Sequence, residues 1–399
     1  MKFSKFIIVF SILATTNCLG LLFYQMLGFG KEIGFVSLLL IGLWYLLNRG
    51  QKSKEKSYFS REILLLILVP FISVIPCFYY RGQDVFTTAV ATRNVCFWFV
   101  YFLLHQVSFG EKKICKVLIS FGAVGTFIYL IQQIAYPTYY WFDSLSATFV
   151  DIRSGFYRFR LFWNNPYIYF AFFYYAVIAL KRKNPTYKFL ALFFFSGIFL
   201  TLTRQIWLCC LLPVFMYPLL NGKNVSIKKI LSICISFVLL YFLVVNLVSI
   251  LGAKLVNDTL NDLNSDDNIR MLALNFYGLE YWVNPLNVIF GNGIPSFGKS
   301  EYGNFIYHME NVRGLYRADI GIVGVMSQYG AIYVFVLLMY YVRVFKNFKY
   351  LPTHLRMLFV ASVMNLPLAS WDIFPLFMGC VTYYADCEIK KAKENYSYE

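Results

Sequence analysis

Long apolar runs alternate with short polar segments along the whole chain, and the polar segments carry most of the lysines and arginines. An apolar run of about 18 or more residues is typical of a helix that crosses a membrane. The pattern therefore predicts an all-α fold: a polytopic integral membrane protein with about twelve transmembrane helices. Their approximate ranges are 6–26, 33–48, 63–79, 85–104, 114–135, 165–180, 189–203, 205–220, 230–251, 319–342, 357–370 and 373–386.

The distribution of basic residues predicts which segments face the cytoplasm. Lysine and arginine gather at 1–5, 49–62, 105–116, 181–188, 221–229, 343–356 and in the C-terminal tail. Because cytoplasmic loops carry an excess of these residues, we expect both termini on the cytoplasmic side. The two long outer segments are then 137–164 and 252–318. The whole chain, 1–399, is expected to form one membrane domain whose outer end is capped by the later segment.

Composition narrows the class of protein further. Of the 399 residues, 59% are hydrophobic and only 14% are charged, which excludes an ordinary water-soluble core. A net charge of +16 could indicate a nucleic-acid partner. Here the basic residues are divided among short segments between apolar runs, so they orient the chain in a lipid bilayer, and no nucleic-acid partner is expected.

Arg204 lies midway in an apolar run between Lys188 and Asn221, and both ends of that run are predicted to be cytoplasmic. Two helical halves of roughly 15 residues reach about 23 Å each, less than a hydrocarbon core about 30 Å thick. Arg204 is therefore expected at the tip of a hairpin sunk below the outer membrane surface. A charged residue at that depth predicts a functional site. The same reasoning places Asp372 at the tip of a second short hairpin.

Arg93 lies in the first half of the fourth predicted crossing. Two roles stay open for it. It can form a structural contact with Asp372 or with the nearby Arg81 and Asp84, or it can line a cavity. The structural role is slightly favoured.

The late outer segment, 252–318, begins a predicted amphipathic helix after the capping sequence Ser265–Asn268. Its apolar positions recur at helical spacing and end before Pro285; they are Ile269, Leu272, Phe276, Leu279 and Trp282. We expect this helix to lie over the membrane. Arg270 falls in its first turn, where anions are favoured, although a solvated arginine paired with Asp266 or Asp267 is an equal alternative.

The stretch from Gly293 to Ser300 matches the P-loop pattern and follows a strand-like Val288–Phe290. We reject a nucleotide site there. A P-loop needs a parallel sheet and cytoplasmic nucleotide, whereas this segment is expected outside the cell and is too short for that fold.

Five residues that could act on a substrate gather just before the tenth predicted crossing; they are His308, Glu310, Arg313, Arg317 and Asp319. Histidine and carboxylates can serve as general bases, and arginine can bind phosphate. One histidine with scattered acids does not have metal-ligand spacing, so metal-independent chemistry without a cofactor is favoured. The alternative for His308 is a purely structural role.

The earlier outer segment, 137–164, combines tyrosine, tryptophan and phenylalanine with Arg153, Arg158 and Arg160. Aromatic faces can stack on sugars and arginines can bind phosphates, which would suit a glycan. For most of these residues an aromatic belt at the membrane interface, with snorkelling arginines, is the better interpretation.

Taken in order, several short motifs between about residues 150 and 345 resemble those of the O-antigen and capsular polysaccharide repeat-unit polymerases and of the related O-antigen ligases. The motifs are Arg160–Pro166, Leu202–Arg204, Arg270 with Trp282 and Asn284–Pro285, Gly291–Gly293, Asp319–Gly324, and Tyr329–Gly330. Ligases of this group usually place a histidine directly before an asparagine in the late loop. Here Met309 follows His308, which favours the polymerase branch.

The resemblance implies a GT-C-like membrane glycosyltransferase of the bacterial cytoplasmic membrane. Such an enzyme transfers a growing glycan from undecaprenyl diphosphate to the next lipid-linked oligosaccharide on the outer face, without metal or cofactor. The catalytic residues would be Arg204 with Arg270, and a base chosen from Asp319, Glu310 and His308. The substrate-binding residues would be Arg317, Arg313, Arg160, Arg158, Arg93 and Asp372. A chain-length regulator and the export machinery are the implied partners.

Two alternatives remain. A ligase would use the same donor but pass finished polymer to a final acceptor. A flippase or other transporter of lipid-linked oligosaccharides would also have about twelve helices and cavity arginines, but transporters usually show internal repeats. The larger of the two outer segments, 252–318, forms one cap on one side of the membrane, and this asymmetry favours an enzyme that works at one face.

Overall fold

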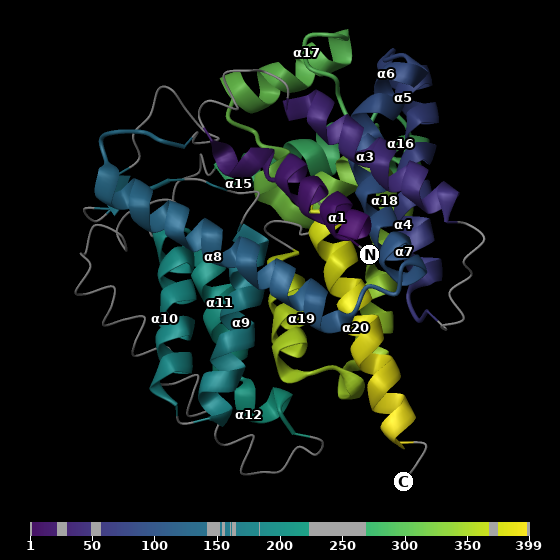
Figure 1. The fold of residues 1–399 in the computed structure, drawn as a ribbon. Coiled ribbons are helices and arrows are strands. Elements are labelled where there is room, and N and C mark those ends of the chain that lie inside the picture. The colour runs from purple at the N-terminus through teal and green to yellow at the C-terminus, as the bar shows by residue number, and fades with distance from the viewer. Residues whose placement is uncertain are drawn as a thin grey trace.

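The computed structural model describes residues 2–21, 30–48, 57–141, 152–153, 156–159, 161, 165–182, 184–222, 269–366 and 374–396. This part of the chain is almost entirely helical (Figure 1). Its only sheet is a two-stranded antiparallel ribbon of β1 (Ile152–Arg153) and β2 (Phe156–Tyr157). The expected all-helical class is therefore confirmed for the described residues.

The first half of the chain contains a series of helices before β1. They are α1 (Lys2–Thr15), η1 (Asn17–Gly20), α3 (Gly30–Leu47), α4 (Ser60–Ile72), α5 (Val74–Arg81), α6 (Val85–Thr92), η2 (Arg93–Phe99), α7 (Val100–Gln106) and α8 (Glu111–Ala135). After β2 come α9 (Asn165–Lys181), α10 (Pro185–Leu200), α11 (Arg204–Phe215) and α12 (Tyr217–Leu220).

The last third begins with α15 (Ile269–Asn275), η4 (Phe276–Glu280), α16 (Pro285–Phe290), α17 (Glu301–Tyr307), η5 (His308–Val312) and η6 (Arg317–Ile320). It ends with α18 (Gly321–Lys346), η7 (Phe348–Tyr350), α19 (Thr353–Asn365) and α20 (Pro375–Tyr396).

In the described part of the chain, four continuous helical stretches are long and apolar enough to cross a membrane: Ser60–Arg81, Val85–Gln106, Glu111–Ala135 and Arg317–Lys346. Shorter apolar helices cover Phe3–Thr15, Glu32–Leu47, Pro185–Leu200 and Gln205–Phe215. Each predicted crossing contains a helix, except 230–251, which lies outside the described residues. These apolar helices indicate a helical membrane protein. The count of twelve crossings and the orientation of the termini stay predictions.

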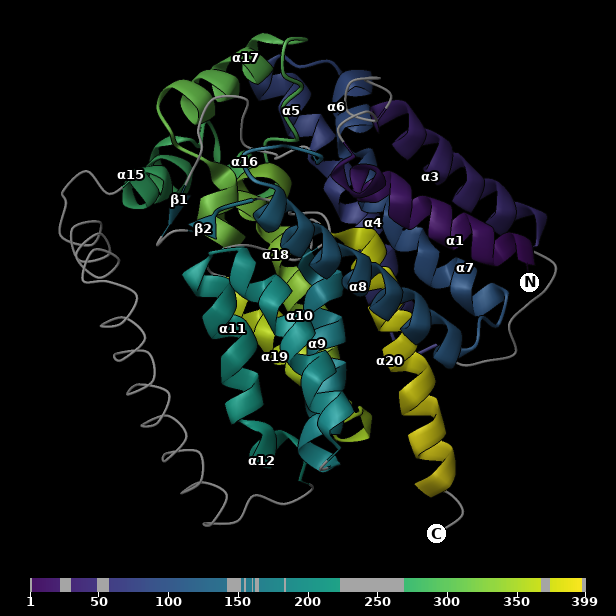
Figure 2. The same cartoon turned by 60° about the vertical axis from the view of Figure 1, so that its left-hand side comes forward.

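Residues 269–320, which we call the cap, lie across one end of the helix bundle. Figures 1 and 2 show α16 and α17 near α5 and α6 toward this end, with α15 on the other side of the cap, and α12 and the C-terminus at the opposite end of the bundle. The cap has its own apolar core, in which Ala273, Tyr277 and Tyr281 pack with Tyr302 and with Cys77 of α5.

The helix predicted from Ile269 onward is present as α15 and η4, but its inward face is not the one that the apolar spacing marks. Ala273 and Tyr277 are buried, whereas Ile269 is 53% and Leu279 75% exposed. The proposed cap sequence before it, with Asp266 and Asp267, lies outside the described residues. The helix therefore presents an apolar stripe outward and a tyrosine face inward.

Two glycines join the cap to α18. Gly330 has φ 80° and ψ 172° and interrupts the helix, and the amides of Asn292 and Gly293 donate to the carbonyls of Ser327 and Gln328 at 3.2 and 2.9 Å. A Cβ on Gly330 would lie 2.3 Å from the carbonyl oxygen of Ile289, and one on Gly291 2.3 Å from that of Gln328. Only glycine allows so close a backbone approach at these φ values. The motifs at 291–293 and 329–330, distant in sequence, are in direct contact.

The end of α5 also fastens the cap. The Nε of Arg81 donates to Oδ1 of Asn292 at 2.8 Å, and its guanidinium lies 4.2 Å from the centre of the Tyr281 ring. The hydroxyls of Tyr281 and Tyr302 are 2.5 Å apart. Burial raises the pKa of both phenols, and the nearby guanidinium groups only partly oppose this, so both phenols stay protonated at neutral pH.

Candidate functional site

The turn predicted at Arg204 is present. Helix α10 ends at Leu200, Leu202 adopts φ 47°, and α11 begins at Arg204 after an extended Thr203. With 16 and 12 residues, α10 and α11 span about 24 and 18 Å at about 1.5 Å per residue. Both are shorter than a hydrocarbon core of about 30 Å. Arg204 is the first residue of α11, and the helix dipole favours an anion at this position. The side chain of Arg204 lies outside the described part of the chain.

The earlier outer segment reaches this turn. Nη2 of the half-buried Arg158 lies 3.5 Å from Oγ1 of Thr203, at the limit of a hydrogen bond. The segment is held on α8 and α9, because the hydroxyl of Tyr129 accepts from the Leu161 amide at 3.1 Å and donates to Asn165 at 2.8 Å. Arg160 lies outside the described residues, so its predicted role stays a prediction.

A second helix end meets the same turn. Nε2 of Gln205 donates to Oδ1 of Asn365, the last residue of α19, at 2.5 Å. The amide of Ile322, near the start of α18, donates to the carbonyl of Leu366 at 2.8 Å. We call this meeting of Thr203–Gln205, Asn365–Leu366 and Gly321–Ile322 the junction. Sequence reasoning missed Gln205 and Asn365, although both are amides within apolar runs beside a predicted hairpin tip.

Asp372, predicted at the second hairpin tip, lies outside the described residues, but the elements around it are placed. Helix α20 begins three residues later at Pro375, and it packs against η2, which begins at Arg93. The half-buried Arg93 donates from Nη1 to the carbonyl of Val90 at 2.6 Å. Asp84, which was suggested as another partner of Arg93, caps α6 by accepting from the Thr87 amide at 3.0 Å. The structural and the cavity-lining roles of Arg93 both stay open.

Two of the predicted cap residues form an ion pair. Nε of Arg317 lies 2.7 Å from Oε1 of Glu310, and the side chains are only 8% and 13% exposed. Nη1 of Arg317 is buried and has no hydrogen-bond partner among the described residues. The ion pair occupies Nε of Arg317 and Oε1 of Glu310, so these two atoms are not available to a substrate unless the contact is broken.

The other predicted residues of the late segment are exposed. Asp319 lies in η6 beside Arg317, and α15, which carries Arg270, packs against η6. His308 begins η5, and Arg313 follows it. The structure therefore brings Arg270 and Asp319 into adjacent elements, and Asp319 is three residues from the junction at Ile322.

The P-loop-like segment is not built to hold a phosphate. Residues 288–290 belong to helix α16, so the expectation of a strand there was wrong. Several of the amides that such a loop would offer are already used: that of Gly293 donates to the Gln328 carbonyl, that of Ser296 to the Gln83 side chain at 2.8 Å, and that of Gly298 to the Asn304 side chain. Rejection of a nucleotide site is supported by this geometry.

Two histidines lie outside the cap. One of them, His354, is surrounded by aromatic rings at the start of α19. Its ring is stacked on Tyr384 at 5.7 Å and meets the edges of Phe170 and Tyr174. Burial, with a smaller contribution from Lys181, lowers its pKa to about 3. His354 is therefore neutral at physiological pH and has a packing role.

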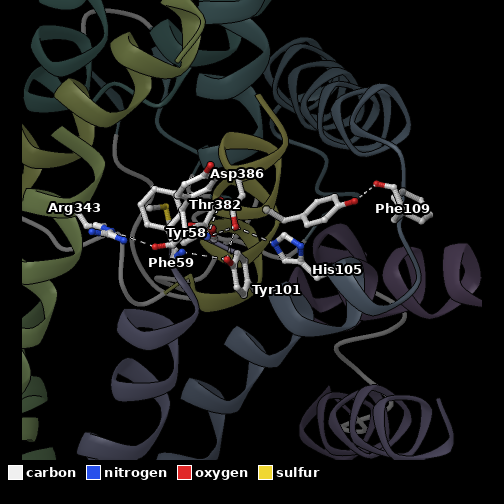
Figure 3. Close-up of polar contacts among 10 residues, drawn as sticks. Tyr58, Phe59, Tyr101, His105, Phe109, Arg343, Thr382 and Asp386 are labelled. Carbon is white, nitrogen blue, oxygen red and sulfur yellow. Dashed lines mark hydrogen bonds and ion pairs between the residues drawn. The ribbon is translucent and has the colours of Figure 1, made fainter. Parts of the chain in front are cut away.

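The third histidine belongs to a buried polar network that sequence reasoning missed (Figure 3). Its centre is Asp386 of α20, which is 2% exposed. The Asp386 carboxylate accepts from the hydroxyl of Tyr101 at 2.5 Å and from the amide of Tyr58 at 3.0 and 3.1 Å, and it lies 3.0 Å from Nε2 of His105. Isolated polar letters in apolar runs were the only signal for it in the sequence.

Comparison with protein-family models, with curated proteins and with solved structures finds no match for this chain. Among the described residues, no group of three or more His, Cys, Asp or Glu side chains is placed to hold a metal ion.

Proposed function

We propose that this chain is a membrane glycosyltransferase that polymerises lipid-linked oligosaccharides. The observation that carries the proposal is the junction, where the turn before Arg204 meets Arg158, the end of α19 and the start of α18. Residues that the family resemblance marks as functional, far apart in sequence, lie on elements that converge there. Short helices on both sides of the turn fit a site below the outer membrane surface.

The chemistry expected of this site is displacement of a lipid diphosphate. The acceptor hydroxyl oxygen forms a bond to the anomeric carbon, the bond from that carbon to the diphosphate breaks, and the hydroxyl proton passes to a base. Arg204, Arg158 and the first turn of α11 would stabilise the negative charge that develops on the leaving group. Undecaprenyl diphosphate is the carrier that the resemblance implies.

Among the three candidate bases, the geometry favours Asp319. Glu310 is held by Arg317 at 2.7 Å and would first have to release it. Asp319 is exposed and three residues from Ile322, whose amide is part of the junction. A carboxylate within hydrogen-bond reach of the acceptor hydroxyl can take its proton. His308 is exposed but begins an element farther along the chain from the junction.

Glycan gels test the proposal. They compare cells in which the wild-type chain is replaced by one variant at a time. Arg204→Ala is expected to leave single repeat units on the final acceptor, and Asp319→Asn to do the same. The matched control is Arg182→Ala, an exposed arginine after α9, which should retain the full ladder.

Other outcomes overturn the proposal. Complete polymer stranded on the lipid carrier would identify a ligase. Repeat units accumulating on the inner leaflet would identify a transporter. A normal ladder with Arg204→Ala at wild-type protein level would remove Arg204 from the site.

A further inference from the structure

Three tyrosine rings pack together where the end of α8 meets β2, toward the cap end of the bundle in Figure 2. The rings of Tyr136 and Tyr157 are stacked with their centres 4.8 Å apart, and the ring of Tyr139 meets both of them edge-on. We call these three residues the tyrosine cluster. Tyr157 is buried and Tyr136 is half-buried, whereas Tyr139 is 39% exposed. The cluster therefore has a buried base and one ring that a ligand can reach.

Side chains of α8 fix the positions of these rings. The side-chain amide of Gln133 bonds the backbone nitrogen of Tyr157 at 3.0 Å and its carbonyl oxygen at 2.8 Å. Gln132 donates from Nε2 to the Thr138 carbonyl at 2.9 Å and accepts from the Tyr140 amide at 3.1 Å. The segment that carries the exposed ring is thereby bonded to α8 on both sides of that ring. A tyrosine ring that is already held in place loses little conformational entropy when it binds a ligand.

Strand β2 connects the tyrosine cluster to the junction. Successive side chains of a strand point to opposite faces. Tyr157 packs in the cluster, whereas the ring of the preceding Phe156 meets the Phe199 ring, near the end of α10, edge-on at 5.7 Å. The following residue, Arg158, reaches Thr203 at 3.5 Å. The two neighbours of Tyr157 in the chain therefore both contact the turn that leads into the junction.

We infer that the tyrosine cluster is a saccharide subsite, which binds the sugar next to the diphosphate of a lipid-linked substrate. The inference rests on the proposed function, in which the diphosphate lies at the junction. This sugar is bonded directly to the diphosphate, so it must lie beside the junction, and the chain leads from Arg158 at the junction to the cluster in one residue. A tyrosine ring offers an apolar face to the C–H groups of a sugar, and its hydroxyl can exchange a hydrogen bond with a sugar hydroxyl.

An aromatic belt at the membrane interface is the other explanation for these rings. A belt residue has only to place its ring at the level of the headgroups, and stacking on two further rings is not required for that. Tyr79 in α5 fits the description of a belt residue, because it is 74% exposed and its ring meets that of its neighbour Phe78. The packing and the backbone bonds around Tyr139 favour a ligand instead, and Tyr79 provides the control.

Titration of the full chain in lipid nanodiscs with a free oligosaccharide tests the subsite. The probe is the repeat unit that mild acid releases from the lipid-linked oligosaccharides of host cells lacking the chain, so it carries neither diphosphate nor lipid. Tyr139→Ala should raise the Kd of this oligosaccharide by roughly tenfold, through loss of the stacking face. Tyr139→Phe keeps that face and should raise the Kd by less. The matched control, Tyr79→Ala, should bind as wild type does.

A further variant keeps the test decisive if Tyr139→Ala lowers the melting temperature. Tyr139→Leu retains an apolar side chain without a flat face, and it should bind as weakly as Tyr139→Ala. Three results would each overturn the inference: a wild-type protein that does not bind the oligosaccharide, a Tyr139→Leu protein that binds it as tightly as wild type, or an equal loss in Tyr79→Ala. The last result would assign Tyr139 to an aromatic belt.

The subsite and the proposed function fail separately. Binding that depends on Tyr139 in a protein that forms no polymer would retain the saccharide subsite and remove the transferase. Polymer formation by a protein whose binding is unchanged in Tyr139→Ala would retain the transferase and remove the subsite.

Discussion

Replacing Gly330 by alanine should loosen the cap from α18. The backbone there has φ 80° and ψ 172°, a region open essentially to glycine alone, and forcing another residue into it costs about 1–3 kcal/mol. The added Cβ would also lie 2.3 Å from the Ile289 carbonyl oxygen, so Gly291 must move away. The two hydrogen bonds from Asn292 and Gly293 would weaken, at about 0.5–1.5 kcal/mol each. Together these effects amount to about 2–6 kcal/mol.

Thermal unfolding in detergent measures this loss. An unfolding entropy of about 2.1 cal/mol/K per residue gives about 0.8 kcal/mol/K for this chain, so the expected fall in Tm is about 2–7 °C. A thiol-reactive dye can follow the melt, because buried cysteines such as Cys77, in the cap core, become accessible.

The matched control is Gly42→Ala in α3. A Cβ at Gly42 meets nothing within 4 Å, so the substitution should raise stability by up to about 1 kcal/mol through helix propensity. A Gly330→Ala protein that melts within about 1 °C of wild type, or no lower than Gly42→Ala, would contradict the reasoning.

Three further predictions concern polar side chains. His354 binds a proton in the unfolded chain below pH 6.5, but in the folded chain only near pH 3. The folded state should therefore lose stability as the pH falls from 6.5 toward 3. In thermal melts between pH 7 and pH 4, His354→Phe should reduce this dependence of Tm on pH. Glu310→Gln leaves Arg317 charged and buried and should cost about 3–5 kcal/mol, whereas Glu310→Leu with Arg317→Met should restore most of the Tm; equal melts for the two would contradict this. Gln205→Ala and Asn365→Ala should each shorten the glycan ladder, and the double variant should be no worse than either; simple additivity would argue against a shared bond.

Hydropathy and charge predicted features that depend on neighbours in sequence. The break between α10 and α11 follows from two basic flanks around a run too long for one crossing and too short for two full ones. The helix after Ile269 follows from its spacing. Both are local, and both are present.

Contacts between distant segments could not be predicted in this way. Nothing near Gln205 indicates that Asn365 is its partner, and nothing near Asp386 indicates Tyr58. The prediction of a strand at 288–290 was wrong because three apolar residues fit either a strand or a buried helix. The segment forms helix α16, whose start is capped by Oδ1 of Asn284 accepting from the Leu286 amide. The inward tyrosine face of α15 and η4 arises from Arg81 and Tyr302, which sequence spacing does not show.

The outward apolar stripe of α15 and η4 has a consequence for how molecules approach the junction. Water does not stabilise a helix that turns isoleucine and leucine outward, but acyl chains do. Hydrocarbon would then extend partway up the side of the cap, and the boundary between lipid and water would not be level around this protein. A molecule anchored by a long isoprenoid tail could diffuse to the cap laterally, with its tail never leaving the bilayer.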